Sequence, residues 1–335
     1  MKSISKVSIL LLILALVLGT LSGCSSDKEL VTIKLNEVVR SIFYAPHYVA
    51  ISKGFFEEEG LKIELTTGQG ADKTMTALLS GQADIGFAGP EATIYVYNQG
   101  KEDHAIVFAQ LTQTDGSFLV GRQPEPNFKW ENLKGKTIIG GRPGGVPQMT
   151  LEYVLREHGI DPLEDVELIT NLQFTATAGA FAGGMGDYVA LFEPTGSMLE
   201  AEGAGAVVAS LGRAGGFIAY TAYCALGSYI EENPEIIQKF TNAIYKGQIW
   251  VQQHSSEEIA AAVQPFFPDT DLNLLTTVVD RYKEQDSWCT NPVIIPETLD
   301  RLQDIMETAG ELEKRVPYDR IVTNEFAEEA VRIIK

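Results

Sequence analysis

The chain has few basic residues. It contains 26 Lys and Arg against 45 Asp and Glu among its 335 residues, which gives a formal net charge of −19. Nowhere do the basic residues gather into a cluster. Because nucleic acids and anionic lipid surfaces attract clustered positive charge, this composition argues against both as partners. The apolar fraction of 45% is that of an ordinary packed globular chain.

Cysteine and histidine are scarce as well. The chain has three Cys and four His, and none of them stand at metal-ligand spacing. Cys224 and Cys289 could pair, but both lie in apolar or aromatic stretches, which favours two free buried thiols. Only His47 lies beside a candidate site, and we expect it to pack within a helix rather than to bind a ligand.

Long apolar runs are absent except at the start of the chain. The run Ile9–Leu18 follows Lys2 and Lys6, and it is shorter than the roughly 20 residues that cross a bilayer. A basic start, a short apolar core and small residues before a cleavage site are typical of an export signal. We therefore predict that residues 1–23 are a signal peptide.

The end of this segment reads Leu-Ser-Gly-Cys, with the cysteine at position 24. It resembles the bacterial lipoprotein processing box, in which the cysteine becomes the lipidated first residue. The resemblance implies lipidation at Cys24 and a short solvated tether over residues 24–30. The mature protein would then be held on the outer face of the bacterial cytoplasmic membrane by its lipid anchor alone.

A glycine-rich loop lies between a β-branched run and a helix-like run, in "IIGGRPGGVPQMTLEYVLREHG" at residues 138–159. Arg142 stands where a dinucleotide fingerprint starting at Gly140 needs its second glycine. Val146 stands where a phosphate loop needs its lysine. Two interpretations stay open: a strand-to-helix turn without a ligand, or a small-molecule recognition loop at a helix N-terminus.

Strand-like and helix-like segments alternate in two runs, and from residue 234 the chain is nearly all helix. This order predicts an α/β fold whose mostly parallel sheets are covered on both faces. The expected strands are 31–36, 61–66, 83–88, 105–110, 136–140, 166–170, 188–192, 206–210 and 219–226. The expected helices are 46–53, 55–59, 72–80, 92–98, 147–158, 175–182, 195–202, 234–254, 256–264, 271–286, 296–309 and 324–334.

Ligands of open α/β sheets bind at the carboxyl ends of strands, where loops meet helix N-termini. The loops in that position are the candidates for a binding site. They are residues 37–46, 68–73, 89–91, 111–116, 141–148, 171–177 and 193–196.

Five segments, in order, carry a family resemblance. They read "YAPHYVAISKGFFEEEGLKIEL", "LLSGQADIGFAGPEA", "GKTIIGGRPGG", "GDYVALFEPTG" and "SYIEENPEIIQKFTNAIYKGQIWV". They resemble the corresponding blocks of the ABC-transporter solute-binding lipoproteins of the nitrate, sulfonate, taurine and thiamine-pyrimidine (NMT1-like) family. Each block is weakly specific by itself, whereas the ordered set covers essentially all of residues 31–335.

The resemblance implies a two-lobed periplasmic-binding-protein-like fold of type II, with the ligand cleft between the lobes. Lobe one would comprise residues 31–115 plus 222–335, and lobe two residues 116–221. The glycine loop would be the recognition loop of lobe two. The implied partners are a small-molecule solute, an ABC permease and its ATPase, and we expect the protein to be a monomer.

The same family includes an enzyme branch, the fungal thiamine-pyrimidine synthases. Their iron-binding run of clustered cysteines is absent from this sequence. The candidate loops also hold no Ser/His/Asp, paired-acid or metal constellation. We therefore expect a binding protein rather than an enzyme, with no catalytic residue, no metal and no cofactor.

The candidate loops and their flanks contain aromatic residues that could sandwich a flat heterocycle. For Phe43 and Phe192 core packing is an equal alternative, whereas Tyr44 lies in a loop where the family binds its ligands. The candidate aromatic walls are Phe43, Tyr44, Tyr188, Phe192, Tyr220 and Trp288.

Two acidic residues bear on the ligand's charge. Glu91 opens a helix, so it could be a ligand group or only a partner of the helix dipole. Glu193 follows a strand end and is the better candidate. A carboxylate facing the cleft favours an amino group over a bare anion, whereas Arg142 would favour an anion if it does not turn to solvent.

We accordingly predict a thiamine-precursor aminopyrimidine or related flat amino heterocycle, with taurine, another alkanesulfonate or nitrate as the alternative. The expected ligand-binding residues are Tyr44, Pro46, Gly89, Glu91, Gly144, Gly145, Val146, Tyr188, Glu193 and Tyr220.

Overall fold

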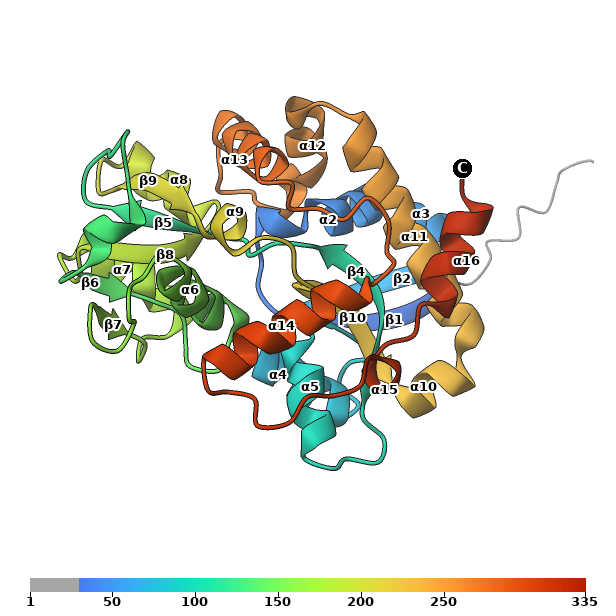
Figure 1. Cartoon of the computed structure of the whole chain (residues 1–335). Helices are drawn as coiled ribbons and strands as arrows, with labels where there is room; N and C mark the ends of the chain where they lie inside the picture. Colours follow the sequence, from blue (N-terminus) through green and yellow to red (C-terminus); the bar gives the residue numbers. More distant parts are fainter. Residues whose placement is uncertain (1–29) are drawn as a thin grey trace, which may run out of the picture. The chain divides into compact units, whose positions relative to one another are not determined.

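The computed structural model describes residues 30–335 (Figure 1). The expected signal over residues 1–23, the lipidation site Cys24 and the tether as far as residue 29 lie outside the described residues. In the described part of the chain, no helix is both long enough and apolar enough to cross a membrane.

The first sheet has five strands in the order β2-β1-β3-β10-β4. β1 pairs in parallel with β2 and β3, whereas β10 pairs antiparallel with β3 and β4. β10 runs against its neighbours because the chain leaves this sheet at the end of β4 and returns at the same point, where Thr221 pairs with Thr112. The strands are β1 (Val31–Glu37), β2 (Leu61–Thr67), β3 (Ile85–Ala88), β4 (Ala105–Thr112) and β10 (Thr221–Leu226).

The second sheet has five strands in the order β7-β6-β8-β5-β9. β6 pairs in parallel with β7 and β8, and β5 pairs antiparallel with β8 and β9. The sequence prediction lacks β5, although the turn signal Asp115-Gly116 stands directly before its short apolar run. The strands are β5 (Ser117–Gly121), β6 (Thr137–Ile139), β7 (Glu167–Ile169), β8 (Tyr188–Phe192) and β9 (Ala206–Ser210).

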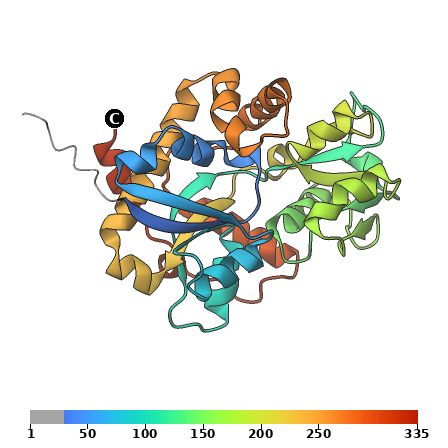
Figure 2. The same ribbon diagram turned by 180° about the vertical axis from the view of Figure 1, so that it is seen from behind.

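Helices surround both sheets. α2 and α11 cover one face of the first sheet, α12 packs on α2 and α13, and α4 and α5 cover the other face (Figures 1 and 2). The short α9, α10 and α15 are absent from the sequence prediction. The helices are α2 (Ala45–Ser52), α3 (Phe55–Glu58), α4 (Ala71–Leu79), α5 (Glu91–Asn98), α6 (Val146–Glu157), α7 (Thr177–Ala182), α8 (Thr195–Ala201), α9 (Leu211–Gly215), α10 (Gly227–Glu232), α11 (Pro234–Gln253), α12 (Ser256–Val263), α13 (Leu272–Glu284), α14 (Pro296–Thr308), α15 (Tyr318–Ile321) and α16 (Glu325–Ile333).

Both sheets are mixed, with two parallel and two antiparallel pairings each, whereas the sequence pattern predicts mostly parallel sheets. The second sheet packs side chains on both of its faces. Neighbouring residues of one strand point to opposite faces, so Ile138 packs with α6 whereas Ile139 packs with α7 and α8. We call the first sheet with α2–α5 and α10–α16 the first lobe, and the second sheet with α6–α9 the second lobe. The predicted α/β fold with two sheets is confirmed.

The chain passes between the lobes twice, from β4 to β5 and from β9 to β10. We call residues 113–116 and 216–220 the crossing segments. Asp115 lies in the first of them, fully buried, and its Oδ1 accepts a hydrogen bond of 2.7 Å from the backbone N–H of Ser117. Burial raises the pKa of Asp115 to about 6.

His47 and the two cysteines belong to the interior of the fold. The His47 ring is fully buried and stacks on Phe87, and its Nδ1 lies 3.0 Å from the hydroxyl of Tyr223. Burial lowers the pKa of His47 to about 3. Cys224 and Cys289 are free buried thiols. The structure thus confirms a packing role for His47 and confirms that the two thiols do not pair.

Candidate ligand-binding site

A cavity of about 150 Å³ lies between the lobes, about the size that accepts a benzene ring. Five of the seven loops expected from the sequence contribute to its wall. The first lobe supplies Val38, Val39, Gln69, Gly70, Ala71, Gly89 and Glu91. The second lobe supplies Ser117, Gly140, Gly141, Arg142, Gly145, Val146, Pro147, Leu172, Gln173, Phe174, Thr177, Ala190 and Phe192. Tyr220 and Thr221 come from the second crossing segment and the start of β10.

Four helices begin at this cavity. Ala71, Glu91, Val146 and Thr177 are the first residues of α4, α5, α6 and α7, and all four line it. No side-chain hydrogen bond caps any of these helix starts. Because the first N–H groups of a helix lack partners inside the helix, they can serve a ligand's acceptor atoms.

Glu91 places a carboxyl group in the cavity wall. The residue is 4% exposed, and its Oε2 has no hydrogen-bond partner among the described residues. A Cβ atom on Gly89 would lie 1.9 Å from that oxygen. The glycine therefore leaves the space into which the Glu91 carboxyl folds.

The surroundings of Glu91 favour the protonated form of its carboxyl group. Burial raises the pKa of Glu91 to about 7, and the nearby positive charge of Arg142 opposes this rise. A buried carboxyl that is half protonated near neutral pH can accept a hydrogen bond from a ligand N–H or donate one to a ligand oxygen. Such an unpaired group at a cavity is a candidate ligand contact.

Aromatic rings form part of the same wall. Phe192 lies between Phe174 and Phe43, with ring centroids 5.8 Å and 5.7 Å apart. Phe43 is fully buried, and the centroid of its ring also lies 5.5 Å from that of Tyr220. Phe43 therefore belongs to the hydrophobic core, whereas Phe192 and Tyr220 line the cavity. The Tyr220 hydroxyl has no hydrogen-bond partner in residues 30–335.

Arg142 lines the cavity from the second lobe, and its side chain is also partly exposed to solvent. Its Nη2 lies 3.3 Å from Oδ1 of Asp72, which is on α4 of the first lobe. Both side chains are substantially exposed, at 45% and 60%, so this ion pair is weak. The Tyr95 hydroxyl makes a second contact between the lobes by donating to the carbonyl of Gly144 at 3.1 Å.

The structure brings together five of the residues expected from the sequence: Gly89, Glu91, Gly145, Val146 and Tyr220 all line the cavity. Gly144 lies directly beside them. Tyr44 and Pro46 are buried within the first lobe, outside the cavity wall. Trp288 also serves the core, where its indole N–H donates to the carbonyl of Phe43 at 2.8 Å.

Tyr188 lies on β8 but outside the cavity wall, and its hydroxyl donates to Glu125 at 2.8 Å. Ala190 and Phe192, further along the same face of the strand, do line the cavity. Tyr188 therefore shares a strand and a face with two wall residues but stands at the end of β8 remote from the cavity, so its expected role as a ligand contact has no support in this geometry.

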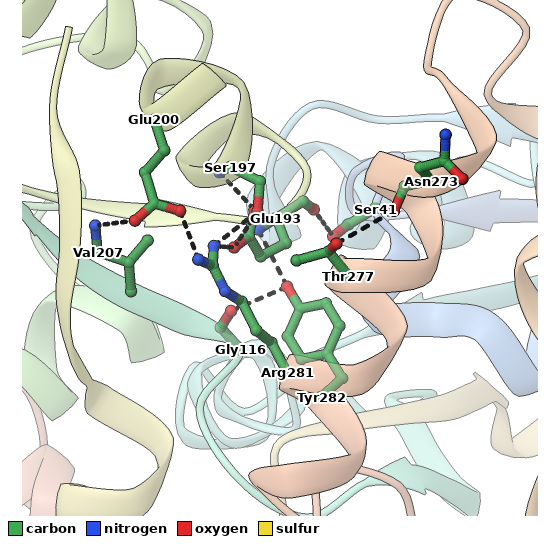
Figure 3. A network of polar contacts seen from close by, with 10 residues as sticks. All are labelled: Ser41, Gly116, Glu193, Ser197, Glu200, Val207, Asn273, Thr277, Arg281 and Tyr282. Atoms are coloured by element: carbon green, nitrogen blue, oxygen red, sulfur yellow. Dashed lines mark hydrogen bonds and ion pairs between the residues drawn. The ribbon is translucent and has the colours of Figure 1, made fainter. Parts of the chain in front are cut away.

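The Glu193 side chain does not line the cavity. Its carboxylate instead binds Arg281 of the first lobe in a contact between the lobes (Figure 3). Its Oε2 accepts from the backbone N–H of Ser197 at 2.8 Å, and its Oε1 accepts from Arg281 on α13 at 2.5 Å. Tyr282, the next residue on α13, accepts from the Glu193 N–H at 3.1 Å and donates to the Gly116 carbonyl at 3.0 Å. The interpretation of Glu193 as a ligand group thus has no support in this geometry.

Several cavity residues were not chosen from the sequence, among them Val38, Val39, Gln69 and Phe174. All four lie in loops that the sequence marks as strand carboxyl ends. A search of those loops for every apolar or amide side chain would have found them.

Among residues 30–335, no group of three or more His, Cys, Asp or Glu is placed to hold a metal ion. The expected lack of a cofactor stays a prediction.

Comparison with known proteins gives a family and a fold. The model of the family described as NMT1/THI5 like matches residues 42–258. A Bacillus subtilis (strain 168) protein named "Putative binding protein YtlA" is 49% identical over 308 residues, which cover 92% of each chain. The riboflavin-binding protein RibY of Chloroflexus aurantiacus is 22% identical, with 86% of this chain and 83% of RibY covered.

Two solved structures illustrate the shared fold. The periplasmic aliphatic sulphonate-binding protein SsuA from Escherichia coli superposes with a TM-score of 0.69 at 17% identity, covering 87% of this chain and 97% of SsuA. The desulfurization enzyme DszB superposes with a TM-score of 0.65 at 16% identity, covering 91% of this chain and all of DszB. At such identities the likeness concerns the fold only.

Proposed function

The chain belongs to the NMT1/THI5-like family of solute-binding proteins, and we propose that it is the extracytoplasmic solute-binding component of an ABC importer for a small, flat amino heterocycle. A thiamine-precursor aminopyrimidine fits this description. Its partners would be the permease and the ATPase of that importer. The protein would act as a monomer on the outer face of the membrane, held by a lipid on Cys24.

The observation that carries the proposal is the unpartnered Oε2 of Glu91 beside aromatic wall residues. An amino group of the ligand would donate to this carboxyl, while the ring would lie against Phe192 and Tyr220. The riboflavin-binding relative RibY supports a flat nitrogen heterocycle as ligand. A bare anion such as nitrate would meet the ionised Glu91 without a compensating donor from the ligand.

The test is a thermal-shift screen of the purified chain without residues 1–24. The panel holds aminopyrimidines, taurine, alkanesulfonates, nitrate and riboflavin. A true ligand at 100 times its dissociation constant should add about 2.7 kcal/mol to the free energy of unfolding. Stabilisation by an aminopyrimidine supports the proposal, and stabilisation by taurine or nitrate alone refutes the ligand class. Mass spectrometry should recover the ligand unchanged, whereas a product that requires added iron would reveal an enzyme.

Gly89→Ala should weaken binding of the screened ligand at least about tenfold, roughly 1.4 kcal/mol. The new methyl group would occupy the position of Glu91 Oε2 and displace the carboxyl. The fold should survive, because the displaced group is the end of a flexible side chain. Titration calorimetry measures the affinity and circular dichroism the fold.

Gly179→Ala is the matched control, because a Cβ atom there meets nothing within 4 Å. Gly179 lies on α7, outside the cavity wall. Equal affinities for the two alanine variants would contradict a role for the Glu91 carboxyl in the site.

A further inference from the structure

Two residues of the cavity wall stand opposite each other at one end of the second sheet. Ser117 begins β5, Phe192 ends β8, and the two are partners in the antiparallel ladder between these strands. Both line the cavity. Gly116 precedes Ser117 and Glu193 follows Phe192, so whatever holds these two outer residues also places the wall residues beside them.

A single hydroxyl group of the first lobe bridges Gly116 and Glu193. The Tyr282 hydroxyl accepts a hydrogen bond from the Glu193 backbone N–H at 3.1 Å and donates one to the Gly116 carbonyl at 3.0 Å (Figure 3). Tyr282 lies on α13 and is fully buried. Because water does not reach this place, the hydroxyl supplies a partner that both backbone groups need.

The first lobe holds Glu193 at two further points. The Ser41 hydroxyl donates to the Glu193 carbonyl at 2.7 Å, and the Arg281 guanidinium donates to the Glu193 carboxylate at 2.5 Å. The backbone N–H, the backbone carbonyl and the side chain of this one residue are therefore all bound by the first lobe. The end of β8 is fixed in direction as well as in position.

The ring of Tyr282 packs behind the aromatic part of the cavity wall. Its centroid lies 5.1 Å from that of Phe43. The Phe43 ring in turn contacts the wall residues Phe192 and Tyr220. Tyr282 itself does not line the cavity. Since the packed interior has little free space, a shift of Tyr282 would be passed to these rings.

We infer that Tyr282 is a positioning residue of the binding site, whose hydroxyl holds the ends of β5 and β8 against the first lobe and thereby keeps Phe192 in place for the ligand. This inference rests on the proposed function in taking the cavity as the ligand site. The competing explanation is that Tyr282 only stabilises the fold. Its loss would then lower the free energy of unfolding and leave ligand affinity unchanged.

The test is a double-mutant cycle of Tyr282→Phe and Phe192→Leu that measures ligand affinity. The probe is 4-amino-5-hydroxymethyl-2-methylpyrimidine, and titration calorimetry at fixed pH and salt gives its dissociation constants. Tyr282→Phe should weaken binding roughly 5- to 30-fold, because it leaves a buried N–H and a buried carbonyl without their partner. In the Phe192→Leu background the same change should weaken binding less than about twofold, since the ring that Tyr282 positions is already gone.

Tyr223→Phe is the matched control. Tyr223 is also fully buried, and its hydroxyl has a hydrogen-bond partner in His47, but both residues belong to the first lobe and neither lines the cavity. This variant should lose stability and bind the probe as the parent does. A Tyr282→Phe variant with the affinity of the parent would overturn the inference and leave the proposed function intact. Equal losses of affinity in the two Phe192 backgrounds would do the same.

Hydrogen exchange of the ligand-free protein tests the inference without any ligand. Tyr282→Phe should speed the exchange of backbone N–H groups in residues 117–121 and 188–193 and leave the first sheet unchanged. Failure of the parent to bind the probe would refute the aminopyrimidine proposal, and the exchange rates would then decide on Tyr282. Acceleration confined to β5 and β8 supports the inference, whereas uniform or absent acceleration overturns it.

Discussion

Arg281→Met should lower the free energy of unfolding by about 3–5 kcal/mol. The guanidinium of Arg281 joins α13 of the first lobe to three acceptors of the second lobe (Figure 3). It donates to Glu193 Oε1 at 2.5 Å and to Ser197 Oγ at 2.6 Å, and it also binds Glu200. The Glu193 side chain is fully buried, so the methionine variant would leave a buried carboxylate without its cation. Urea denaturation near pH 7.5, followed by circular dichroism, measures the loss.

Arg332→Met is the matched control, because Arg332 pairs with Glu329 on the exposed face of α16, with exposed fractions of 71% and 38%. Arg332→Met should change the stability little, because water screens an exposed ion pair. The double variant Arg281→Met with Glu193→Gln should recover a large part of the stability, since the glutamine carries no charge to leave unpaired. A single Arg281 variant as stable as the Arg332 variant would show that the buried network contributes little.

The sequence predicts the neighbourhood of the site well, for a physical reason. Parallel strands bring their carboxyl ends to one edge of a sheet, so a list of post-strand loops is a list of neighbours in space. Five of the seven loops found this way contribute to the cavity. The glycine loop of residues 141–148 is among them and lies at the start of α6.

The choice between the two acidic residues could not be made from local sequence. Glu91 and Glu193 both follow a strand end and stand at or near the start of a helix. What separates them is Arg281, which lies 88 positions after Glu193 and occupies its carboxylate. No spacing rule connects α13 with the end of β8, because their contact depends on how the two lobes pack together.

Tyr188 shows a different limit of the sequence pattern. Alternation correctly places Tyr188 on the same face of β8 as Ala190 and Phe192. Strands rise by about 3.3 Å per residue. Tyr188 precedes Phe192, at the carboxyl end of β8, by four residues, and this separation keeps the Tyr188 hydroxyl away from the cavity. Position along the strand, as well as its face, decides whether a residue reaches the site.

Glu91→Gln should stabilise the ligand-free protein at pH 8 while it weakens ligand binding. Burial raises the pKa of Glu91 from 4.5 to about 7, so the folded protein keeps a proton that the unfolded chain loses between these values. The stability associated with this proton is fully present below pH 4.5 and is lost as the pH rises through 7. Above pH 7 the ionised carboxylate costs the folded state about 3 kcal/mol. Glutamine does not ionise and should avoid this cost.

Binding should change in the opposite direction. A carboxylate that accepts from an amino group of the ligand contributes about 1.5–3 kcal/mol, so Glu91→Gln should weaken binding of the aminopyrimidine probe roughly 10- to 100-fold. Urea denaturation from pH 4.5 to 8 and titration calorimetry at pH 8 measure the two effects. The stability difference between variant and parent should be small at pH 4.5 and grow toward pH 8.

Asp115→Asn is the control, since burial raises the pKa of Asp115 in the same direction, from 3.8 to about 6, but Asp115 does not line the cavity. This variant should gain stability toward high pH and keep its affinity for the probe within about threefold, a difference below roughly 0.7 kcal/mol.

A Glu91→Gln variant that gains stability yet binds the probe as the parent does would remove Glu91 from the site. A variant that loses affinity with no gain in stability at pH 8 would show that the ionised carboxylate is already compensated in the ligand-free protein. The joint outcome, a more stable protein that binds less well, is expected where a buried charge is kept for the ligand it receives.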